Sequence, residues 1–431
     1  MKAGSTLRLL ILAFGLILIS SRAMAGPTLV FDPATGDVLS AERAGEPWYP
    51  ASLTKLMTAY VIFEKLKTGQ LKLDQKIQVS ELAAKQPPSK LGMRVGSTIS
   101  VDLALQSMLV YSANDMAYVL AEAGAGGDYK RFAQQMNLAA QRLGMTGTYY
   151  VNPNGLFNPL QVTTARDLAL LVQALLKEYP EHAHYFSQAA VKIGKRNLNN
   201  RNSLLRQMKN ADGMKTGFVC NSGYNLIASA SEDGHRLVAI IFGARNGKQR
   251  ADQAQKMLTN QFQLPVPPNA PKLASLANAP LGTLVPADLT GTVCRGKPLD
   301  IADAETLAGW GISFGRYETA QIANMALRGR VLSGRDWVRE GSAGVVKMPG
   351  SVGYSAMVWS LDQQTSNALC TYLKQQNAYC DVMTPESFSR ISAMAIAEAR
   401  SKPTITPASA EGVDVAPPPK KKKKTARKRK K

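Results

Sequence analysis

Histidine is scarce in this chain of 431 residues, which contains three, His182, His184 and His235. Few histidines are therefore available to act as the base of a Ser-His-Asp triad, so we expect that a nucleophile here is not activated by an imidazole. Cysteine is also rare, with four residues and no CxxC spacing of the kind that binds zinc. The sequence therefore implies neither a metal ion nor an organic cofactor.

The N-terminus lacks an apolar run long enough to span a bilayer. Leu9 to Ile19 is apolar but has eleven residues, against the roughly twenty that a membrane-spanning helix needs. Lys2 and Arg8 supply positive charge, and Ala23-Met24-Ala25 has the small-x-small form cut by signal peptidases. We therefore predict a signal peptide over residues 1–25 and an exported protein of the periplasm or cell envelope; the alternative is a retained membrane anchor.

Export makes disulfides possible, and Cys220, Cys294, Cys370 and Cys380 allow three pairings. Cys370 and Cys380 flank one predicted helix and the strand that follows it, so they are the expected local pair. Cys220 with Cys294 would then tie one folded region to the next segment. The sequence does not choose among the pairings, nor does it give the oligomeric state.

Acidic residues are outnumbered, and the formal net charge is +21. Ten Lys or Arg lie between Lys420 and Lys431, which leaves +11 for the rest of the chain. We expect residues 400–431 to form a disordered basic tail. The tail is either simply solvated or an electrostatic tether to anionic membrane or wall polymer; binding to nucleic acid is not expected, because the signal directs the chain to export.

Residues 26–262 read as one α+β domain. A hairpin is predicted around the turn at 32–37, and three strands are predicted at Met214 to Cys220, Tyr224 to Ser231 and Arg236 to Phe242. Together they give a five-stranded antiparallel sheet. Apolar residues at three- and four-residue spacing predict helices from Ser52, from about Val101 to Met108, and from Thr164 to Leu176, with Thr163 or Thr164 as N-cap.

The rest of the chain divides into a linker and a smaller unit. Residues 263–305 include a Pro, Ala and Asn-rich stretch typical of linkers. Residues 306–385 read as a compact domain with the order β-α-β-β-α-β.

Ser52-Leu53-Thr54-Lys55 places a hydroxyl and an amine three residues apart at the start of a helix, on one face. Serine is a weak nucleophile until a base takes its proton, and lysine can be that base when burial and nearby positive charge lower its pKa. The helix N-terminus adds N-H groups where an oxyanion would form. Ser-x-x-Lys alone is common by chance.

Two further motifs make the combination specific. Ser112-Ala113-Asn114 follows an apolar helical run, and Lys215-Thr216-Gly217 opens a strand. In this order the three motifs resemble those of penicillin-binding proteins and serine β-lactamases. Longer stretches, from Tyr49 to Ala59 and from Asp212 to Gly217, resemble the low-molecular-mass D-alanyl-D-alanine carboxypeptidases of serine peptidase family S11.

The resemblance covers about 26–262 and implies a penicillin-binding, β-lactamase-like fold and a role for each matched residue. Ser52 would form the acyl-enzyme, Lys55 would accept its proton, and Ser112 would relay protons with help from Lys215. For substrate binding, the resemblance implies that Asn114 orients the peptide amide and that Thr216 binds the terminal carboxylate, with Arg201 as a weaker candidate for the same charge. Gly217 and Phe218 follow on the same strand and would also line the substrate site. The backbone N-H groups of Ser52 and Phe218 would form the oxyanion hole.

Two departures from the family are Asn154 and Gln161, where members often carry histidine. Because we expect these positions to lie away from the three motifs, the departures bear on substrate preference more than on activity.

The 306–385 region resembles a SPOR domain through Trp310-Gly311-Ile312-Ser313-Phe314-Gly315 and through Cys380-Asp381-Val382. The resemblance implies binding to glycan strands stripped of peptide; the alternative is an unrelated small α+β domain. A catalytic and a wall-binding domain on one chain would raise the local concentration of substrate.

The resemblances together imply a carboxypeptidase that removes the terminal D-Ala from peptidoglycan stem peptides in cell-wall remodelling and is inhibited by β-lactam antibiotics. Two alternatives remain. One is a D,D-endopeptidase, which would use the same acyl-enzyme, and the other is a peptidoglycan-binding scaffold that has the peptidase fold but no longer catalyses hydrolysis. A β-lactamase is disfavoured because no Glu-x-x-Leu-Asn element lies between Ser112 and Lys215.

Overall fold

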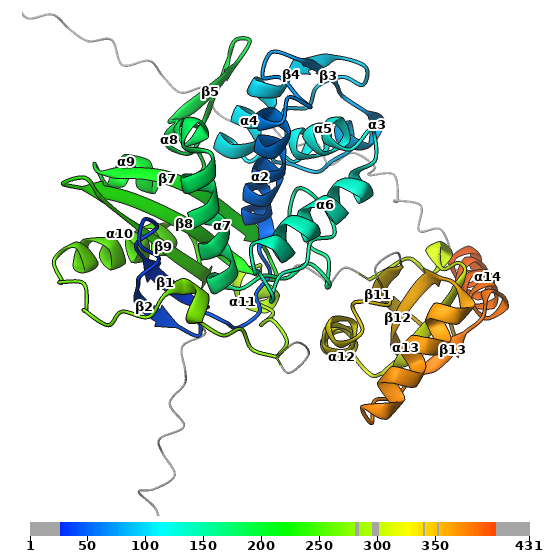
Figure 1. Cartoon of the computed structure of the whole chain (residues 1–431). Helices are drawn as coiled ribbons and strands as arrows, with labels where there is room; N and C mark the ends of the chain where they lie inside the picture. The colour runs from blue at the N-terminus through cyan, green and yellow to red at the C-terminus, as the bar shows by residue number, and fades with distance from the viewer. Residues whose placement is uncertain (1–25, 281–283, 295–300, 339–340, 351–352, 402–431) are drawn as a thin grey trace, which may run out of the picture.

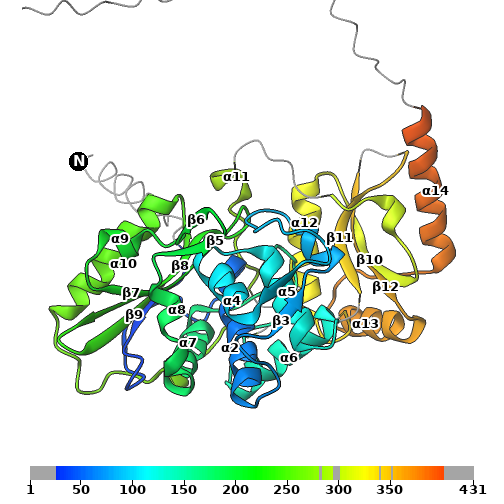
Figure 2. The same ribbon diagram turned by 90° about the horizontal axis from the view of Figure 1, so that it is seen from above.

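The structure is a computed structural model, and it describes residues 26–280, 284–294, 301–338, 341–350 and 353–401. The predicted signal peptide and the basic tail from residue 402 lie outside the described residues. The described chain forms an N-terminal unit, residues 26–294, and a smaller C-terminal unit, residues 301–401, which lie side by side in two perpendicular views (Figures 1 and 2).

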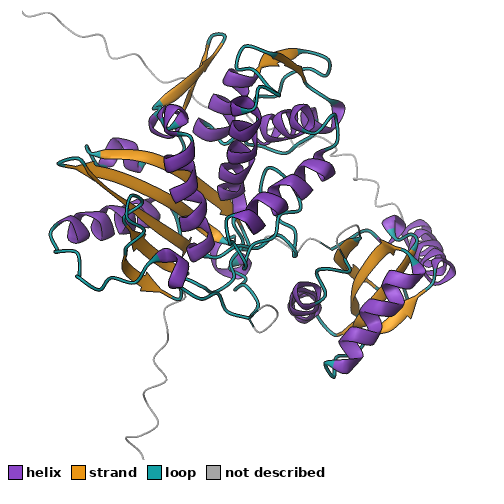
Figure 3. Cartoon of the chain, in the orientation of Figure 1, coloured by secondary structure: helices purple, strands orange, loops and turns teal. Residues whose placement is uncertain are grey.

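A five-stranded antiparallel sheet is the centre of the N-terminal unit, as the sequence predicted (Figure 3). Its spatial order is β2-β1-β9-β8-β7, and the strands span Thr28–Phe31 (β1), Val38–Glu42 (β2), Ala211–Val219 (β7), Gly223–Glu232 (β8) and His235–Ala244 (β9). The first hairpin pairs with β9, so both ends of the unit meet in one sheet. Strand β7, which carries Lys215-Thr216-Gly217, is an edge strand.

Both faces of this sheet are buried, because successive side chains along a strand point to opposite faces and each face packs against helices. Ile227, Val238 and Ile240 point to the large core that also contains α7 (Ala165–Glu178) and α2 (Thr54–Lys67), whereas Leu226 and Ile241 point to α10 (Gly247–Phe262). The predicted N-cap of α7 is Thr164, whose hydroxyl accepts a hydrogen bond from the Asp167 N-H.

Most of the remaining helices gather in a second lobe beside α2 (Figure 1). Its α-helices are α3 (Glu81–Ala84), α4 (Val101–Val110), α5 (Asn114–Gly124) and α6 (Tyr129–Arg142). The shorter helical elements of the N-terminal unit are α8 (His184–Ser187), α9 (Leu204–Gln207), α11 (Thr290–Val293) and the 3-10 turns η1 (Ala51–Leu53), η2 (Pro180–His182) and η3 (Leu273–Ser275). Two two-stranded sheets pair β3 (Lys76–Gln78) with β4 (Thr98–Ser100) and β5 (Ala190–Ile193) with β6 (Arg196–Asn199). A further 3-10 turn, η4 (Ala304–Thr306), belongs to the C-terminal unit.

The C-terminal unit is built on a four-stranded antiparallel sheet of spatial order β11-β12-β10-β13. In chain order its elements are β10 (Trp310–Tyr317), α12 (Ala320–Ser333), β11 (Ser342–Lys347), β12 (Tyr354–Leu361), α13 (Gln363–Gln375), β13 (Asp381–Met383) and α14 (Pro385–Ser401). Helices α12 and α13 pack on one face, and α14 packs on the other through Phe388 and Ile391. Helix α14, which follows the predicted boundary at residue 385, was not expected from the sequence.

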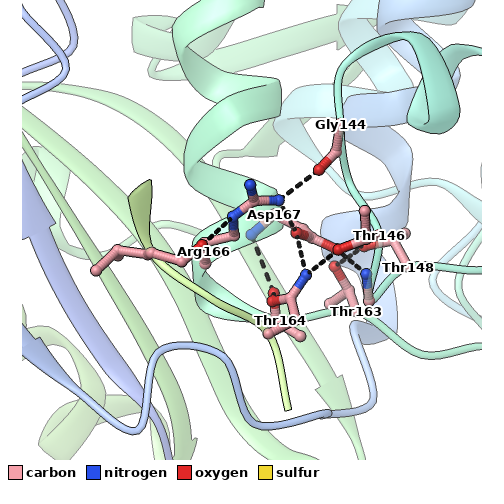
Figure 4. A network of polar contacts seen from close by, with 10 residues as sticks. Gly144, Thr146, Thr148, Thr163, Thr164, Arg166 and Asp167 are labelled. Atoms are coloured by element: carbon pink, nitrogen blue, oxygen red, sulfur yellow. Dashed lines mark hydrogen bonds and ion pairs between the residues drawn. The ribbon is translucent and has the colours of Figure 1, made fainter. Parts of the chain in front are cut away.

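Part of the segment predicted as a linker is fastened to the N-terminal unit. Asn278 donates to Asp167 and to Thr146, its side-chain oxygen accepts from Thr164, and Arg166 donates to the carbonyl of Leu276. The buried Asp167 carboxylate also accepts from Thr148 and from the Gly147 N-H (Figure 4). This network holds the chain that leads toward the C-terminal unit against the base of α7.

Two disulfides are present, Cys220–Cys294 and Cys370–Cys380, with Cα–Cα distances of 5.6 and 5.4 Å. Cys370–Cys380 is the local pair expected from the sequence, and the two bonds together decide which of the three possible pairings the protein adopts. Among the described residues, no helix combines the length and apolar character that crossing a membrane requires.

Candidate active site

Ser52 and Lys55 are in direct contact at the start of α2. Ser52 lies in the 3-10 turn η1, where its side chain is partly exposed, and Lys55 lies in the first turn of α2 and is fully buried. The Lys55 Nζ lies 2.8 Å from the Ser52 Oγ. The predicted pair therefore has hydrogen-bond geometry, with the hydroxyl open to solvent on one side and the amine enclosed.

The surroundings of Lys55 favour its neutral form. Burial is the largest cause that holds the pKa of Lys55 well below its usual range, and the positive charge of Lys215 lowers it further, while Asp115 raises it. Besides Ser52, the Nζ contacts the Asn114 side-chain oxygen at 2.8 Å and the Asn154 carbonyl at 2.6 Å. A neutral amine held by fixed acceptors is suited to take a proton from serine.

Asn154 lies in the site, so the expectation that it lies away from the three motifs is wrong. Its carbonyl contacts Lys55, and its side-chain amide donates to Gln86 at 2.9 Å. The next residue, Gly155, has φ +84°, and a Cβ there would lie 1.9 Å from the Ala51 carbonyl oxygen. The loop can approach the nucleophile this closely because residue 155 has no side chain.

The second motif reaches the same place from the turn between α4 and α5. Ser112 is buried with φ +65°, a backbone conformation uncommon for serine. Asn114 begins α5, donates to the Pro87 carbonyl at 2.9 Å and accepts from Lys55. Asp115 is fully buried and accepts from the N-H groups of Leu91 and Gly92, which fixes the loop between α3 and β4 against α5.

The third motif lies on edge strand β7, next to the 3-10 turn of Ser52. Lys215 is 1% exposed, and burial, followed by the charges of Arg250 and Arg201, lowers its pKa to about 7. Thr216 is buried, and a Cβ on Gly217 would lie 2.9 Å from the Pro50 carbonyl oxygen, so the strand runs directly along the nucleophile turn. Phe218 is 41% exposed and packs on the Tyr224 ring.

Arg201 is close to this group but on its exposed rim. Its guanidinium stacks over the Tyr111 ring at 4.2 Å and donates to the Ser89 hydroxyl at 3.3 Å. Its effect on the pKa of Lys215 places its charge within electrostatic reach of β7. The structure thus brings together Ser52 and Lys55 of the first motif, Asn114 of the second and Lys215 of the third, with Arg201 at their edge.

Two positioning residues were missed in the sequence. The fully buried Asn225 donates to the Tyr49 carbonyl at 3.0 Å and accepts from the Gly243 N-H, so it ties the chain before Ser52 to the sheet. Arg250 on α10 donates to the Asn225 carbonyl and lowers the pKa of Lys215. Neither belongs to a motif, and a single sequence carries no signal that packs α10 on β8 and β9 with Arg250 within electrostatic reach of Lys215.

The arrangement has the parts for nucleophilic attack on a carbonyl carbon: an accessible hydroxyl, a buried amine next to it, and a second buried amine on the adjacent strand. Within the described parts of the chain, no group of three or more His, Cys, Asp or Glu side chains could hold a metal ion.

Comparison with known proteins assigns the family. Residues 19–246 match the family model of the S11 peptidases, described as D-alanyl-D-alanine carboxypeptidase, over more than half of the chain. The chain belongs to this family. The match ends before the C-terminal unit.

The relatives are consistent with this assignment. D-alanyl-D-alanine carboxypeptidase DacC of Escherichia coli K12 is 35% identical over 254 residues, which cover 56% of this chain and 63% of that protein. The chain thus spans less than two thirds of this relative. Among solved structures, penicillin-binding protein 5 of Haemophilus influenzae has a TM-score of 0.54 at 32% identity, covering 56% of this chain and 71% of that one.

A second solved structure is penicillin-binding protein D2 of Listeria monocytogenes in its cefotaxime-bound form. Its TM-score is 0.51 at 31% identity, and the likeness covers 55% of this chain and 97% of that one. The N-terminal unit therefore has the penicillin-binding, β-lactamase-like α+β fold.

Proposed function

We propose that this protein is a serine D-alanyl-D-alanine carboxypeptidase that removes the terminal D-Ala from peptidoglycan stem peptides. The observation that carries the proposal is the 2.8 Å contact between the Ser52 Oγ and the buried Lys55 amine, whose pKa is held well below its usual range. A scaffold without turnover has no need to bury an amine against a serine, because burying it destabilises the fold.

In the proposed reaction Lys55 takes the proton from the Ser52 Oγ as the oxygen attacks the carbonyl carbon of the penultimate D-Ala. The oxyanion would be stabilised by the N-H groups of Ser52 and Phe218. The C–N bond then breaks, and Ser112, with help from Lys215, passes a proton to the nitrogen of the departing D-Ala. Water hydrolyses the remaining ester and frees Ser52. Lys215, Thr216 and Arg201 would bind the substrate carboxylate, and Asn114 its amide.

Inhibition by β-lactams follows from the same chemistry, because the ring carbonyl would acylate Ser52 and hold the ester. The cefotaxime-bound structure of the Listeria protein supports binding of such compounds in this fold. We also propose export to the periplasm or cell envelope, where the substrate lies; the support is the N-terminal sequence and the two disulfides, which persist in oxidising compartments.

For the C-terminal unit we propose binding to glycan strands stripped of peptide, on the basis of its resemblance to a SPOR domain. Helices cover both faces of its sheet, so the accessible sheet positions are at the edges, β11 and β13. Co-sedimentation of the full chain with peptide-free glycan tests this proposal, and no retention would remove it.

Labelling with fluorescent penicillin tests the catalytic proposal. We expect the full chain to be labelled and a Ser52→Ala variant, which keeps the fold, to remain unlabelled. Hydrolysis of a peptide ending in D-Ala-D-Ala, compared with a cross-linked dimeric peptide, then separates carboxypeptidase from endopeptidase. If neither protein is labelled and neither peptide is cleaved, the proposal of a carboxypeptidase is wrong and the non-catalytic scaffold replaces it.

A further inference from the structure

A buried arginine of the C-terminal unit contacts the N-terminal unit behind the nucleophile. Arg328 lies on α12, the helix of the C-terminal unit that faces the N-terminal unit (Figures 1 and 2). Its side chain is 2% exposed, and its Nη2 donates to the Asp288 carboxylate at 2.6 Å. One turn later on α12, Leu332 packs with Tyr49, Phe157 and Val162.

The guanidinium of Arg328 lies over two aromatic rings of the N-terminal unit. Its central carbon is 5.1 Å from the ring centroid of Tyr49 and 5.5 Å from that of Phe157, within cation-π range. The two rings also pack edge to face against each other, with centroids 5.1 Å apart. Arg328 thus contacts two segments that are distant in the sequence.

Both segments continue directly into the site. Tyr49 is three residues before Ser52, and its carbonyl is held by Asn225. Phe157 is three residues after Asn154, whose carbonyl contacts Lys55. A displacement of either ring would therefore move the nucleophile turn or the loop that holds the base.

Asp288 joins a third segment to the same place. Its carboxylate accepts from Asn221 and from the Thr290 N-H, and the Leu289 N-H donates to the Asn221 carbonyl. Asn221 follows Cys220 at the end of β7, the strand of Lys215. Arg328 therefore contacts segments that lead to all three of Ser52, Asn154 and β7.

Stability alone does not account for this arrangement. Removing a cation from water is costly, and a buried ion pair often adds little net free energy of folding. The rate of acylation, in contrast, depends steeply on position, because a displacement of about 1 Å at a reacting group can cost about 100-fold.

We propose that Arg328 is a positioning residue for the acylation of Ser52, so that docking of the C-terminal unit sets the geometry of the active site. This inference rests on the proposed acylation chemistry. It requires no contact between Arg328 and the substrate, because the arginine acts through Tyr49, Phe157 and Asp288.

The test is the rate constant of penicillin acylation in the full chain carrying Arg328→Met, which keeps the length of the side chain and removes its charge and donors. We expect acylation to slow at least tenfold while the final labelled fraction stays complete. The matched control is Arg330→Met on the same helix, because Arg330 donates to Phe314 and Tyr317 within its own unit. We expect the control to acylate within about twofold of wild type.

The kinetic readout separates positioning from folding. A purely structural role would reduce the labelled fraction and leave the rate constant of the folded molecules unchanged. A second variant, Phe157→Leu, addresses the same junction through a partly buried ring if Arg328→Met does not fold. It should slow acylation, and the double variant should be no slower than Arg328→Met alone, since both remove one contact.

Three results would overturn the inference: wild-type acylation rates in Arg328→Met, an unchanged rate in Phe157→Leu, or effects of the two substitutions that multiply. Failure of the proposed function is distinguishable, because wild type itself would then show no labelling that depends on Ser52.

Discussion

At the scale of single residues, the site is defined by two buried lysines. An unfolded lysine is protonated up to about pH 10.4, whereas burial beside Arg250 and Arg201 lowers the pKa of Lys215 to about 7. The unfolded chain therefore binds more protons than the folded one between these values, and this residue makes stability rise with pH across the window from about 7 to 10.5. Below pH 7 the full cost of the buried charge remains.

The pH dependence of acylation follows from the coupling of the two amines. Lys55 must be neutral to accept a proton, so acylation should rise with pH through the pKa of Lys55. The charge of Lys215 is one cause of the low pKa of Lys55. Lys215→Met should therefore raise the pKa of Lys55 and shift the acid limb of the penicillin acylation rate to higher pH. Rates measured from pH 5 to 10 check this, and a limb that stays or moves to lower pH contradicts it.

At the scale of secondary-structure elements, the loop after Pro153 is as important as the helix that carries Ser52 and Lys55. Gly155→Ala places a Cβ against the Ala51 carbonyl at a positive φ. The loop must then move, and we expect acylation to fall at least tenfold, with a loss of about 1–3 kcal/mol in the free energy of unfolding.

Gly194→Ala is the matched control for this substitution. Gly194 also has a positive φ, +57°, but a Cβ there meets nothing within 4 Å. It should lower stability slightly and leave the acylation rate unchanged; equal effects of the two substitutions on acylation would refute the argument.

Sequence patterns predicted the elements whose periodicity is strong. Strands β8 and β9 are long and apolar, and α2 and α7 have continuous apolar faces with Thr164 as a recognisable cap. Helix α10 was missed because mainly small residues, such as Ala251 and Ala254, bury it against the sheet. Helix α14 was missed because Phe388 and Ile391 are a weak signal before a polar tail.

Within the site, the sequence supplied the side chains that do chemistry but not the backbone that holds them. Ser52, Lys55, Asn114 and Lys215 belong to motifs of fixed spacing. The Asn154 carbonyl contributes through its main chain, which any residue type possesses, so its position becomes known only when the loop is folded against α2. Arg328 was missed for a related reason, since its partners belong to another folded unit.

At the scale of the whole molecule, the two disulfides constrain different parts of the chain. Cys220–Cys294 has a sequence separation of 74 residues and Cys370–Cys380 one of 10. Loop-closure entropy assigns them about 4 and about 3 kcal/mol respectively. The first also holds the segment of Asp288 near the end of β7, whereas the second lies within the C-terminal unit.

Replacing each pair with serine separates these roles. Cys220→Ser with Cys294→Ser should lower the unfolding temperature of the N-terminal unit and slow acylation, because the Asp288 segment is released. Cys370→Ser with Cys380→Ser should lower the unfolding temperature of the C-terminal unit alone. Calorimetry together with penicillin acylation checks both, and an unchanged N-terminal transition in the first variant would contradict this assignment.

The position of Arg328 also imposes an order in time. A chain is synthesised from its N-terminus, so Ser52, Lys55, Ser112 and Lys215 all leave the ribosome before Cys294 and well before Arg328. A nascent or clipped chain that stops short of α12 contains every residue of the three motifs without the contact behind the nucleophile. If Arg328 positions the Ser52 turn as proposed, a chain clipped before α12 should be acylated more slowly than the full chain, as is expected of Arg328→Met.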